Sequence, residues 1–407
     1  MEAKTKILIF SAGIFFATFL YAETSLAAGS ISYYQSVYDN VYQSYSTEFN
    51  NMAASGNGAD ENYYYFQYVL DGTLCMYEAT KDVKYLERAL SWAETMLSTA
   101  TIVDSNGNYN WSGPWSSPYT STPIAYQLDD LQGSTELARL ARIIKSNSTL
   151  NNTYGTRATA ILTFVKNQII DKWLYTRDSL SWFYNDATQT SQPMNDKTAL
   201  LMRILLDIYL AGAGTVYHDL AVTLANSFKG RFQTYDNNSM IWDLGVRWDV
   251  IYGTCDGLGC KMDTSHANRY PYTVIDYYKS GIVFTRDYVQ GLANLLTGVM
   301  WDGSYDSPRF TNFTDGSNGY YLSRPPWNDG QIYTGWVGLG EFDTQVQAIS
   351  DATLSAIIAG KSNPSLDYMN NEFGKMELAG HLAKNLALGT LPPDTTPPAA
   401  PIGLRVQ

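Results

Sequence analysis

Residues 68–97 read YVLDGTLCMYEATKDVKYLERALSWAETML. The first part, through Ala79, is apolar on nearly all sides, which is typical of a helix buried within a core. The polar turn Thr80–Asp82 follows. In the second part the apolar residues recur on one helical face: Leu86, Leu90, Ala93 and Leu97. This stretch therefore predicts a buried helix covered by an amphipathic one.

The same pattern returns along the chain. Residues Thr198–Leu210 form a second apolar run, which a Gly-containing turn separates from the amphipathic segment His218–Phe228. Weaker copies cover three further segments: Glu136–Ile170, Tyr272–Met300 and Thr344–Leu388. Successive hairpins of this kind predict a mainly α protein, an (α/α) toroid of about six or seven hairpins with long loops at its cleft end. An open helical solenoid is the alternative, but the irregular spacings and long loops disfavour it.

The two ends of the chain differ from this middle part. Lys4 and Lys6 precede an apolar run over Ile7–Ala22 and a small-residue exit at Ser25–Ala28. This pattern predicts a signal peptide over residues 1–28, and hence a secreted or periplasmic protein with no membrane segment after cleavage. Residues 29–390 are the expected toroid domain. The Pro-rich residues 391–407 resemble a linker and the start of a fibronectin type III module.

Charge restricts the partners. The formal net charge is -12 and no basic run is present, which argues against nucleic acid or an anionic membrane surface as a partner. This overall charge would also repel a polyanionic substrate, so such a substrate needs a local cationic cluster. The candidates surround the central motif: Arg247, Arg269, Arg309 and Arg324.

The three cysteines are informative in an exported protein. Cys255 and Cys260 enclose a short Gly-containing loop, and in an oxidising compartment they are expected to form a disulfide. A metal site is the alternative, but no second Cys or His pair stands at metal-ligand spacing. Cys75 is then a buried thiol. No motif for a cofactor is found, and none is expected, although a calcium ion held by carboxylates stays open.

The motif Asp263–Tyr272, DTSHANRYPY, holds one of only three histidines in the chain. A neutral imidazole at His266 can accept a proton, while Asn268 and Arg269 can hold a carboxylate and Tyr270 can donate a proton. Asp263, Thr264 or Ser265 is expected to cap a helix here, and Pro271 requires that the helix begin late. The alternative is a histidine that only braces this turn. His218 and His381 are expected to be solvated residues of helices.

Aromatic and polar loops supply the remaining candidates, because flat rings with a polar edge can stack on sugars. Tyr63–Phe66 is one aromatic stretch of this kind. The segment Tyr305–Tyr321 offers Tyr320 and Tyr321 as proton donors, although they could simply pack. The expected binding residues are, beside Asn268 and Arg269, Arg309, Asn195, Asn62, Trp327, Tyr333 and Trp336.

The helical repeats followed by Asp-Thr-Ser-His-Ala-Asn-Arg and an Asn/Gly/Tyr loop resemble the (α/α)-toroid polysaccharide lyases of family 38, which includes alginate and glucuronan lyases. The resemblance implies β-elimination on a uronic-acid polymer, a polyanionic polysaccharide substrate, and no cofactor or metal. It assigns His266 as the base, Asn268 and Arg269 as carboxylate contacts, and Tyr320, Tyr321 or Tyr270 as the acid.

Two other functions stay open. An inverting glycoside hydrolase would use two carboxylates about 6.5–9.5 Å apart, one of Asp60 and Glu61 with one of Asp263 and Asp329. This mechanism would leave His266 without a catalytic role. A non-catalytic glycan-binding protein would need only the aromatic platforms.

Overall fold

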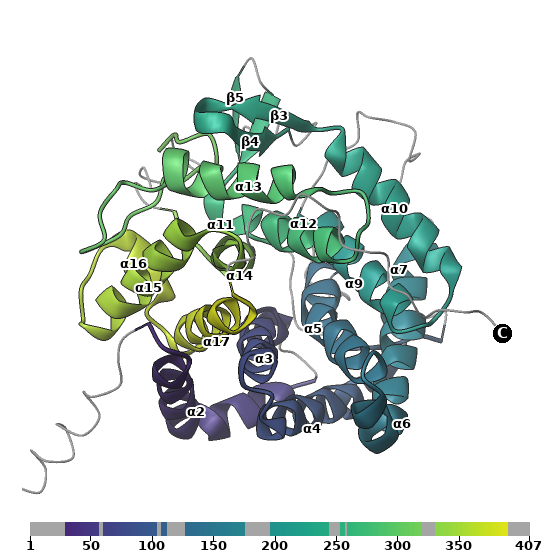
Figure 1. Cartoon of the computed structure of the whole chain (residues 1–407). Coiled ribbons are helices and arrows are strands. Elements are labelled where there is room, and N and C mark those ends of the chain that lie inside the picture. The colour runs from purple at the N-terminus through teal and green to yellow at the C-terminus, as the bar shows by residue number, and fades with distance from the viewer. Residues whose placement is uncertain are drawn as a thin grey trace, which may run out of the picture.

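The computed structural model describes residues 29–56, 60–103, 107–111, 127–175, 196–243, 253–256, 259–318 and 330–389. It is mainly α-helical with little strand, which confirms the predicted class. Six helices lie nearer the centre in Figure 1: α3 (Asp60–Thr80), α5 (Gln127–Lys145), α9 (Asp196–Leu210), α12 (Arg269–Lys279), α14 (Thr334–Gly338) and α17 (Glu372–Leu388).

Other helices lie outside these six in Figure 1: α2 (Ile31–Ala53), α4 (Val83–Thr99), α6 (Ser148–Phe164), α10 (Thr215–Lys229), α13 (Arg286–Leu295) and α15 (Thr344–Ile358). Shorter helices connect them: α7 (Asp171–Tyr175), α11 (Thr264–Ala267) and α16 (Pro364–Met369). Two π-helical segments, at Val165–Ile170 and Leu296–Met300, extend α6 and α13.

The central helices contact one another in sequence. α3 contacts α5, α5 contacts α9, α9 contacts α12, α12 contacts α14, α14 contacts α17, and α17 returns to α3. The outer helices contact their neighbours in the chain, as α3 with α4 and α9 with α10. The inner and outer helices differ in burial in the predicted way. All residues from Thr198 to Ile208 in α9 are buried, whereas α4 buries only one face.

Glycine permits the closest of these contacts, between α3 and α17. A Cβ atom on Gly72 would lie 2.6 Å from the carbonyl oxygen of Met376, and one on Gly380 would overlap the backbone of Gly72. The two backbones therefore touch at a point where only glycine fits. This crossing fixes the distance between the two helices that carry Asp71 and His381, described below.

Replacing Gly380 with alanine should destabilise the fold by about 1–3 kcal/mol, because the added methyl group meets backbone that cannot rotate away. Gly230→Ala is the matched control. Gly230 ends α10 with a φ of -65°, and the nearest atom to an added Cβ is 3.5 Å away. This control should be neutral or slightly stabilising. Urea unfolding of both variants measures the effect, and equal midpoints would contradict the close crossing.

Within the described ranges, three two-stranded antiparallel sheets lie in the connections. They pair β1 (Ile102–Val103) with β2 (Tyr109–Asn110), β3 (Phe232–Tyr235) with β4 (Ser239–Trp242), and β5 (Gly253–Asp256) with β6 (Gly259–Met262). In the β5–β6 hairpin the backbones of Cys255 and Cys260 lie directly opposite each other. The disulfide between them stays a prediction, since their side chains lie outside the described part.

The predicted helices at residues 68–79, 85–97, 198–210 and 218–228 are all present. Two details differ from the expectations. The aromatic run Tyr63–Phe66, expected in a loop, belongs to α3. His381 is fully buried rather than solvated. Cys75 is a buried free thiol, as predicted. The proposed signal peptide and the Pro-rich tail lie outside the described residues.

None of the helices in the described ranges is both long enough and apolar enough to span a membrane.

Candidate active site

The motif around His266 begins where β6 ends. Asp263 pairs with Phe313 in a β-bridge and caps α11, as predicted, since its side chain accepts a hydrogen bond from the His266 backbone N–H at 3.0 Å. Thr264 is fixed on both sides: its backbone N–H donates to Asn312 at 2.7 Å and its hydroxyl to Thr311 at 2.6 Å. The chain then bends at Asn268, and α12 starts at Arg269. Pro271 thus lies in the first turn of α12, where its missing N–H costs nothing.

Asp263 also holds the His266 ring. The imidazole Nδ1 lies 2.8 Å from Asp263 Oδ2 and 3.0 Å from Oδ1. Burial alone would raise the pKa of the Asp263 carboxyl, but the charge of His266 and donors from His266 and Ser265 lower this pKa below its usual range. Asp263 is therefore an anion that accepts a hydrogen bond from a protonated Nδ1. Nε2 is then the nitrogen through which His266 can exchange a proton with a substrate.

His266 lines a pocket whose other walls are mostly aromatic. About a quarter of its side chain is exposed, at 26%. The volume of the pocket is about 70 Å³. The residues that form it come from α3, the His266 turn, the residue before α14, α16, and the cap and first turn of α17: Tyr64, Tyr65, Tyr68, Ser265, His266, Tyr333, Tyr368, Asn371, Phe373 and Gly374.

Arg269 lies beside this pocket rather than in its wall. It is buried, and its Nε donates to Gln132 Oε1 at 3.1 Å while its Nη2 donates to the Tyr64 hydroxyl at 3.1 Å. Gln132 is held in turn, since its amide donates to the Tyr64 carbonyl at 2.8 Å. The Arg269 guanidinium therefore donates to two neutral oxygens, one on Gln132 and one on Tyr64. The second of these bonds orients the Tyr64 hydroxyl in the wall of the pocket.

Three of the predicted site residues are buried and make their contacts within the protein. Asn268 is buried; its amide donates to Ser265 O at 2.5 Å and its oxygen accepts from the Thr334 hydroxyl at 2.9 Å. Trp336 is fully buried and donates to the Thr264 carbonyl at 2.9 Å. Tyr270 is fully buried with its ring 4.5 Å from that of Phe228. These contacts join α11, α12 and α14 and hold His266 in place.

The remaining predicted residues are dispersed. Tyr333 lines the pocket, with its ring 5.5 Å from that of Tyr68. Arg309 is exposed, and its backbone N–H donates to Asp302 at 3.3 Å; it does not line this pocket. Asn62 lies in α3, but its side chain is not among those described. Four candidates fall outside the described residues: Asn195, Tyr320, Tyr321 and Trp327.

Sequence reasoning missed several residues of the pocket wall, namely Tyr68, Tyr368, Asn371 and Phe373. The aromatic run Tyr63–Phe66 was among the candidates, and its Tyr64 and Tyr65 line the pocket from α3. Tyr368, Asn371 and Phe373 come from the start of α17 and the segment before it, and nothing in their spacing connects them to residue 266.

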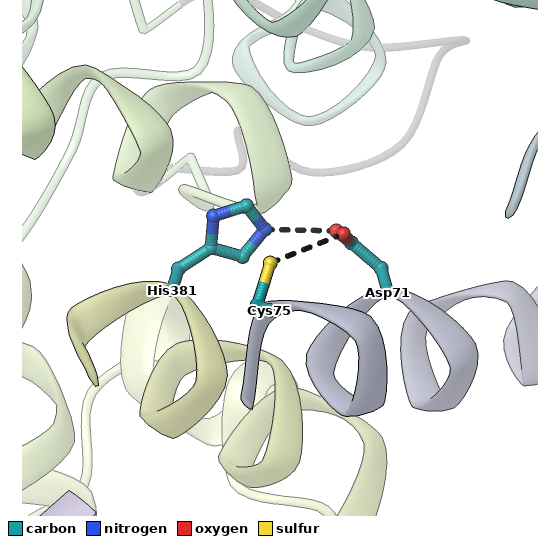
Figure 2. Close-up of side chains that lie close together, drawn as sticks. All are labelled: Asp71, Cys75 and His381. Carbon is teal, nitrogen blue, oxygen red and sulfur yellow. Dashed lines mark hydrogen bonds and ion pairs between the residues drawn. The ribbon is translucent and has the colours of Figure 1, made fainter. Parts of the chain in front are cut away.

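A second group of polar side chains lies between the central helices α3, α5, α12 and α17, outside the His266 pocket. His381 of α17 points its Nε2 at Asp71 of α3, 2.8 Å from Oδ2, and the Cys75 thiol lies one turn from Asp71 at 3.5 Å (Figure 2). Arg139 of α5 donates to Asp71 at 2.5 Å and to Cys75 at 3.3 Å, and the Tyr272 hydroxyl donates to Asp71 at 3.0 Å. All five side chains are essentially inaccessible to solvent.

The charges in this group set one another's ionisation. Burial lowers the pKa of a histidine, but the neighbouring Cys75 and Asp71 raise the pKa of His381 to about 10. Burial would raise the pKa of Asp71, yet His381 and Arg139 lower it below its usual range. His381 is therefore a cation and Asp71 an anion at neutral pH. Glu377, one turn before His381, is buried so deeply that its pKa is raised well above the ordinary value.

Asp71, Cys75 and His381 have the residue types of a metal site, and their ligand atoms all lie within 4.8 Å of one another. The surroundings do not fit a divalent cation. The guanidinium of Arg139 donates to both Asp71 and Cys75, so a positive charge already occupies the place that a metal would need. We interpret the group as a buried ion network.

Comparison of the chain with protein-family models, with curated proteins and with solved structures finds no match. Its function must therefore be inferred from the geometry described above.

Proposed function

We propose that this protein is a secreted polysaccharide lyase that cleaves a uronic-acid-containing polysaccharide, of the alginate or glucuronan type, by β-elimination. The observation that supports this most directly is the Asp263–His266 pair at the wall of an aromatic pocket. β-Elimination needs a base for the proton at C5, groups that stabilise charge on the adjacent carboxylate, and an acid for the departing oxygen.

His266 is the proposed base. Its Nδ1 is held by a carboxylate, so Nε2 is the nitrogen proposed to accept the proton from C5. The resulting imidazolium is stabilised by the anionic Asp263 beside it. A carboxylate that orients a histidine base is also found in the Ser-His-Asp catalytic triad.

Tyr64 is the proposed acid among the described residues. Its hydroxyl oxygen accepts from Arg269 at 3.1 Å, so its own proton is directed elsewhere, and the residue lines the pocket. A cation beside a phenol also stabilises the phenolate that forms when the proton leaves. Tyr320 and Tyr321, the acids that the sequence motif implies, stay alternative proposals.

Arg269 is the proposed source of positive charge for the substrate carboxylate. The net charge of -12 repels a polyanion, so a local cation is needed more for substrate binding in this chain than in a neutral one. Removing one donor to a developing oxyanion commonly costs about 10²–10³ in rate. Asn268 is proposed to hold its neighbours in position, because both the nitrogen and the oxygen of its side-chain amide form hydrogen bonds within the protein.

The helix contacts favour the proposed (α/α) toroid. The six central helices contact one another in a closed sequence, and five of them contact an outer helix that follows them in the chain. Residues from the first turns of α3 and α17, and Tyr333 just before α14, line the pocket. In a toroid these positions belong to one end of the inner ring, where a polymer could lie across the opening.

A hydrolase is less well supported by the same pocket. The described residues that line it include no Asp or Glu, and Asp263 next to it is engaged by His266. An inverting hydrolase needs two carboxylates that face the substrate.

The direct test is ultraviolet absorbance of the conjugated C4–C5 double bond that β-elimination leaves at the new non-reducing end. The mature protein would be incubated with alginate, glucuronan and glycosaminoglycans in turn. We expect absorbance to rise with at least one uronic-acid polymer. New reducing ends without a rise in absorbance would indicate a hydrolase, and neither signal on any of the polymers would contradict the proposed activity on this panel.

A further inference from the structure

A second cavity lies at the opposite end of the same helices. Tyr64 and Glu78 of α3 are fourteen residues apart in the chain, which corresponds to about 21 Å along a helix. The first lines the His266 pocket and the second lines this cavity. Its volume is about 240 Å³, and its walls are mostly charged: Glu78, Arg139, Arg142, Leu206, Asp207, Leu210, Asp276, Lys279, Ser280 and Lys384.

Asp207 offers an unused acceptor in this cavity. Its Oδ1 pairs with Arg142, whereas its Oδ2 is buried and has no hydrogen-bond partner among the described residues. A buried acceptor without a donor costs about 1–3 kcal/mol, so a donor brought by a ligand would recover stability. Burial, together with the charge of Asp276, raises the pKa of Asp207 to about 6, even though Arg142 opposes this shift. A ligand hydroxyl is the simplest donor for such an oxygen.

Lysine and arginine offer unused donors nearby. Lys384 is nearly buried, and its ammonium lies 3.5 Å from Glu78, longer than a good hydrogen bond. Arg142 bonds Asp207 through its Nε, which leaves its two terminal amino groups outside that bond. Lys279 pairs with Glu341 and is about one-third exposed, at 32%. These three cations can together receive one carboxylate.

We propose that this cavity binds a small hydroxy acid of the size of one sugar, with its carboxylate at Arg142, Lys279 and Lys384 and a hydroxyl at Asp207. A simple carboxylate would leave Asp207 unsatisfied, and a neutral sugar would leave the cations unused. A cationic ligand would meet four positive side chains. The volume is below the roughly 300–1,000 Å³ of sites for larger ligands, and the site is independent of the proposed lyase activity.

Three matched probes test the site: glucuronate carries both groups, glucose only the hydroxyls, and propionate only the carboxylate. In isothermal titration with the whole mature protein, glucuronate should bind at least tenfold more tightly than either of the others. Lys384→Met and Asp207→Asn should each weaken binding at least tenfold. His266→Ala should leave it unchanged, which separates this site from the proposed active site.

Lysine footprinting provides a second test that needs no variant and reports on this cavity alone. Acetylation of lysines is followed by mass spectrometry, with and without glucuronate. Lys279 should be protected at least fivefold. Lys361, which also pairs with one carboxylate and is similarly exposed at 37%, should be modified equally in both samples. Unchanged modification of Lys279 at saturating glucuronate, or equal affinity for propionate and glucuronate, would overturn the proposal.

Discussion

Replacing His266 with alanine should reduce kcat for β-elimination by about 10²–10⁴-fold and change KM much less, because a general base contributes to the transition state rather than to binding. The fold should survive, since the side chain is partly exposed and the cap from Asp263 to the backbone N–H remains. The double-bond absorbance assay on the active polymer measures the rate, and thermal unfolding checks the fold.

His218→Ala is the matched control for this experiment. His218 is also bound through Nδ1 to a nearby aspartate, Asp219, at 3.0 Å, and its side chain is exposed to a similar degree, but it lies on α10 outside the pocket. We expect its activity to equal that of the wild type. Activity above one-tenth of the wild type in His266→Ala would show that another group takes the C5 proton.

Asp263→Asn separates orientation from chemistry. Asparagine can still cap α11, but its amide can donate to Nδ1 and so leave the proton on Nε2, where it prevents His266 from acting as a base. A large loss of kcat is therefore expected although the imidazole is still present. An unchanged rate would show that Asp263 serves only as the helix cap.

The sequence alone predicts the helical class, because alternating all-apolar and one-sided apolar segments have few other ways to be buried. It also places Asp263 among three candidate caps and predicts the late start of α12, since both depend on neighbours in the chain. The residues next to the aromatic run Tyr63–Phe66 were a poorer guide. The sequence predicts a loop for this run, yet it belongs to α3, an inner helix.

The partners of the site could not be predicted in the same way. Arg269 meets Gln132 and Tyr64, which are 137 and 205 residues away. His381 was expected to be solvated, and it is instead buried against Asp71, 310 residues away. A polar residue on an apolar helix shows in sequence that a partner is needed, but which partner it meets depends on how the helices contact one another.

Replacing Asp71 with asparagine should destabilise the fold by about 3–5 kcal/mol, because it removes the anion that Arg139 and His381 share in a buried site. The two side chains have nearly the same shape, so the effect reports charge rather than packing. Asp39→Asn is the control: Asp39 also accepts from a lysine and a tyrosine, but at the surface, where such a pair contributes about 0–1 kcal/mol. Urea unfolding at neutral pH measures both.

The same network predicts how stability varies with pH. The pKa of His381 is raised to about 10 in the fold, compared with about 6.5 in an unfolded chain. Its contribution is therefore complete below about pH 6.5 and is lost as the pH rises toward 10, because the folded state then holds a proton that the unfolded state has released. The pKa of Asp71 is lowered, so its contribution is present above about pH 4 and is lost in acid.

His381→Gln isolates the alkaline part of this dependence, because glutamine can still donate to Asp71 but cannot titrate. Between about pH 6.5 and 10, the free energy of unfolding of the wild type should fall relative to that of the variant by roughly 1.4 kcal/mol per pH unit, the value for one proton. Arg139, Lys384 and Glu377 contribute to both proteins, so the difference between the two curves belongs to His381. Parallel curves over this range would mean that His381 is neutral in the folded protein and that Arg139 alone balances Asp71.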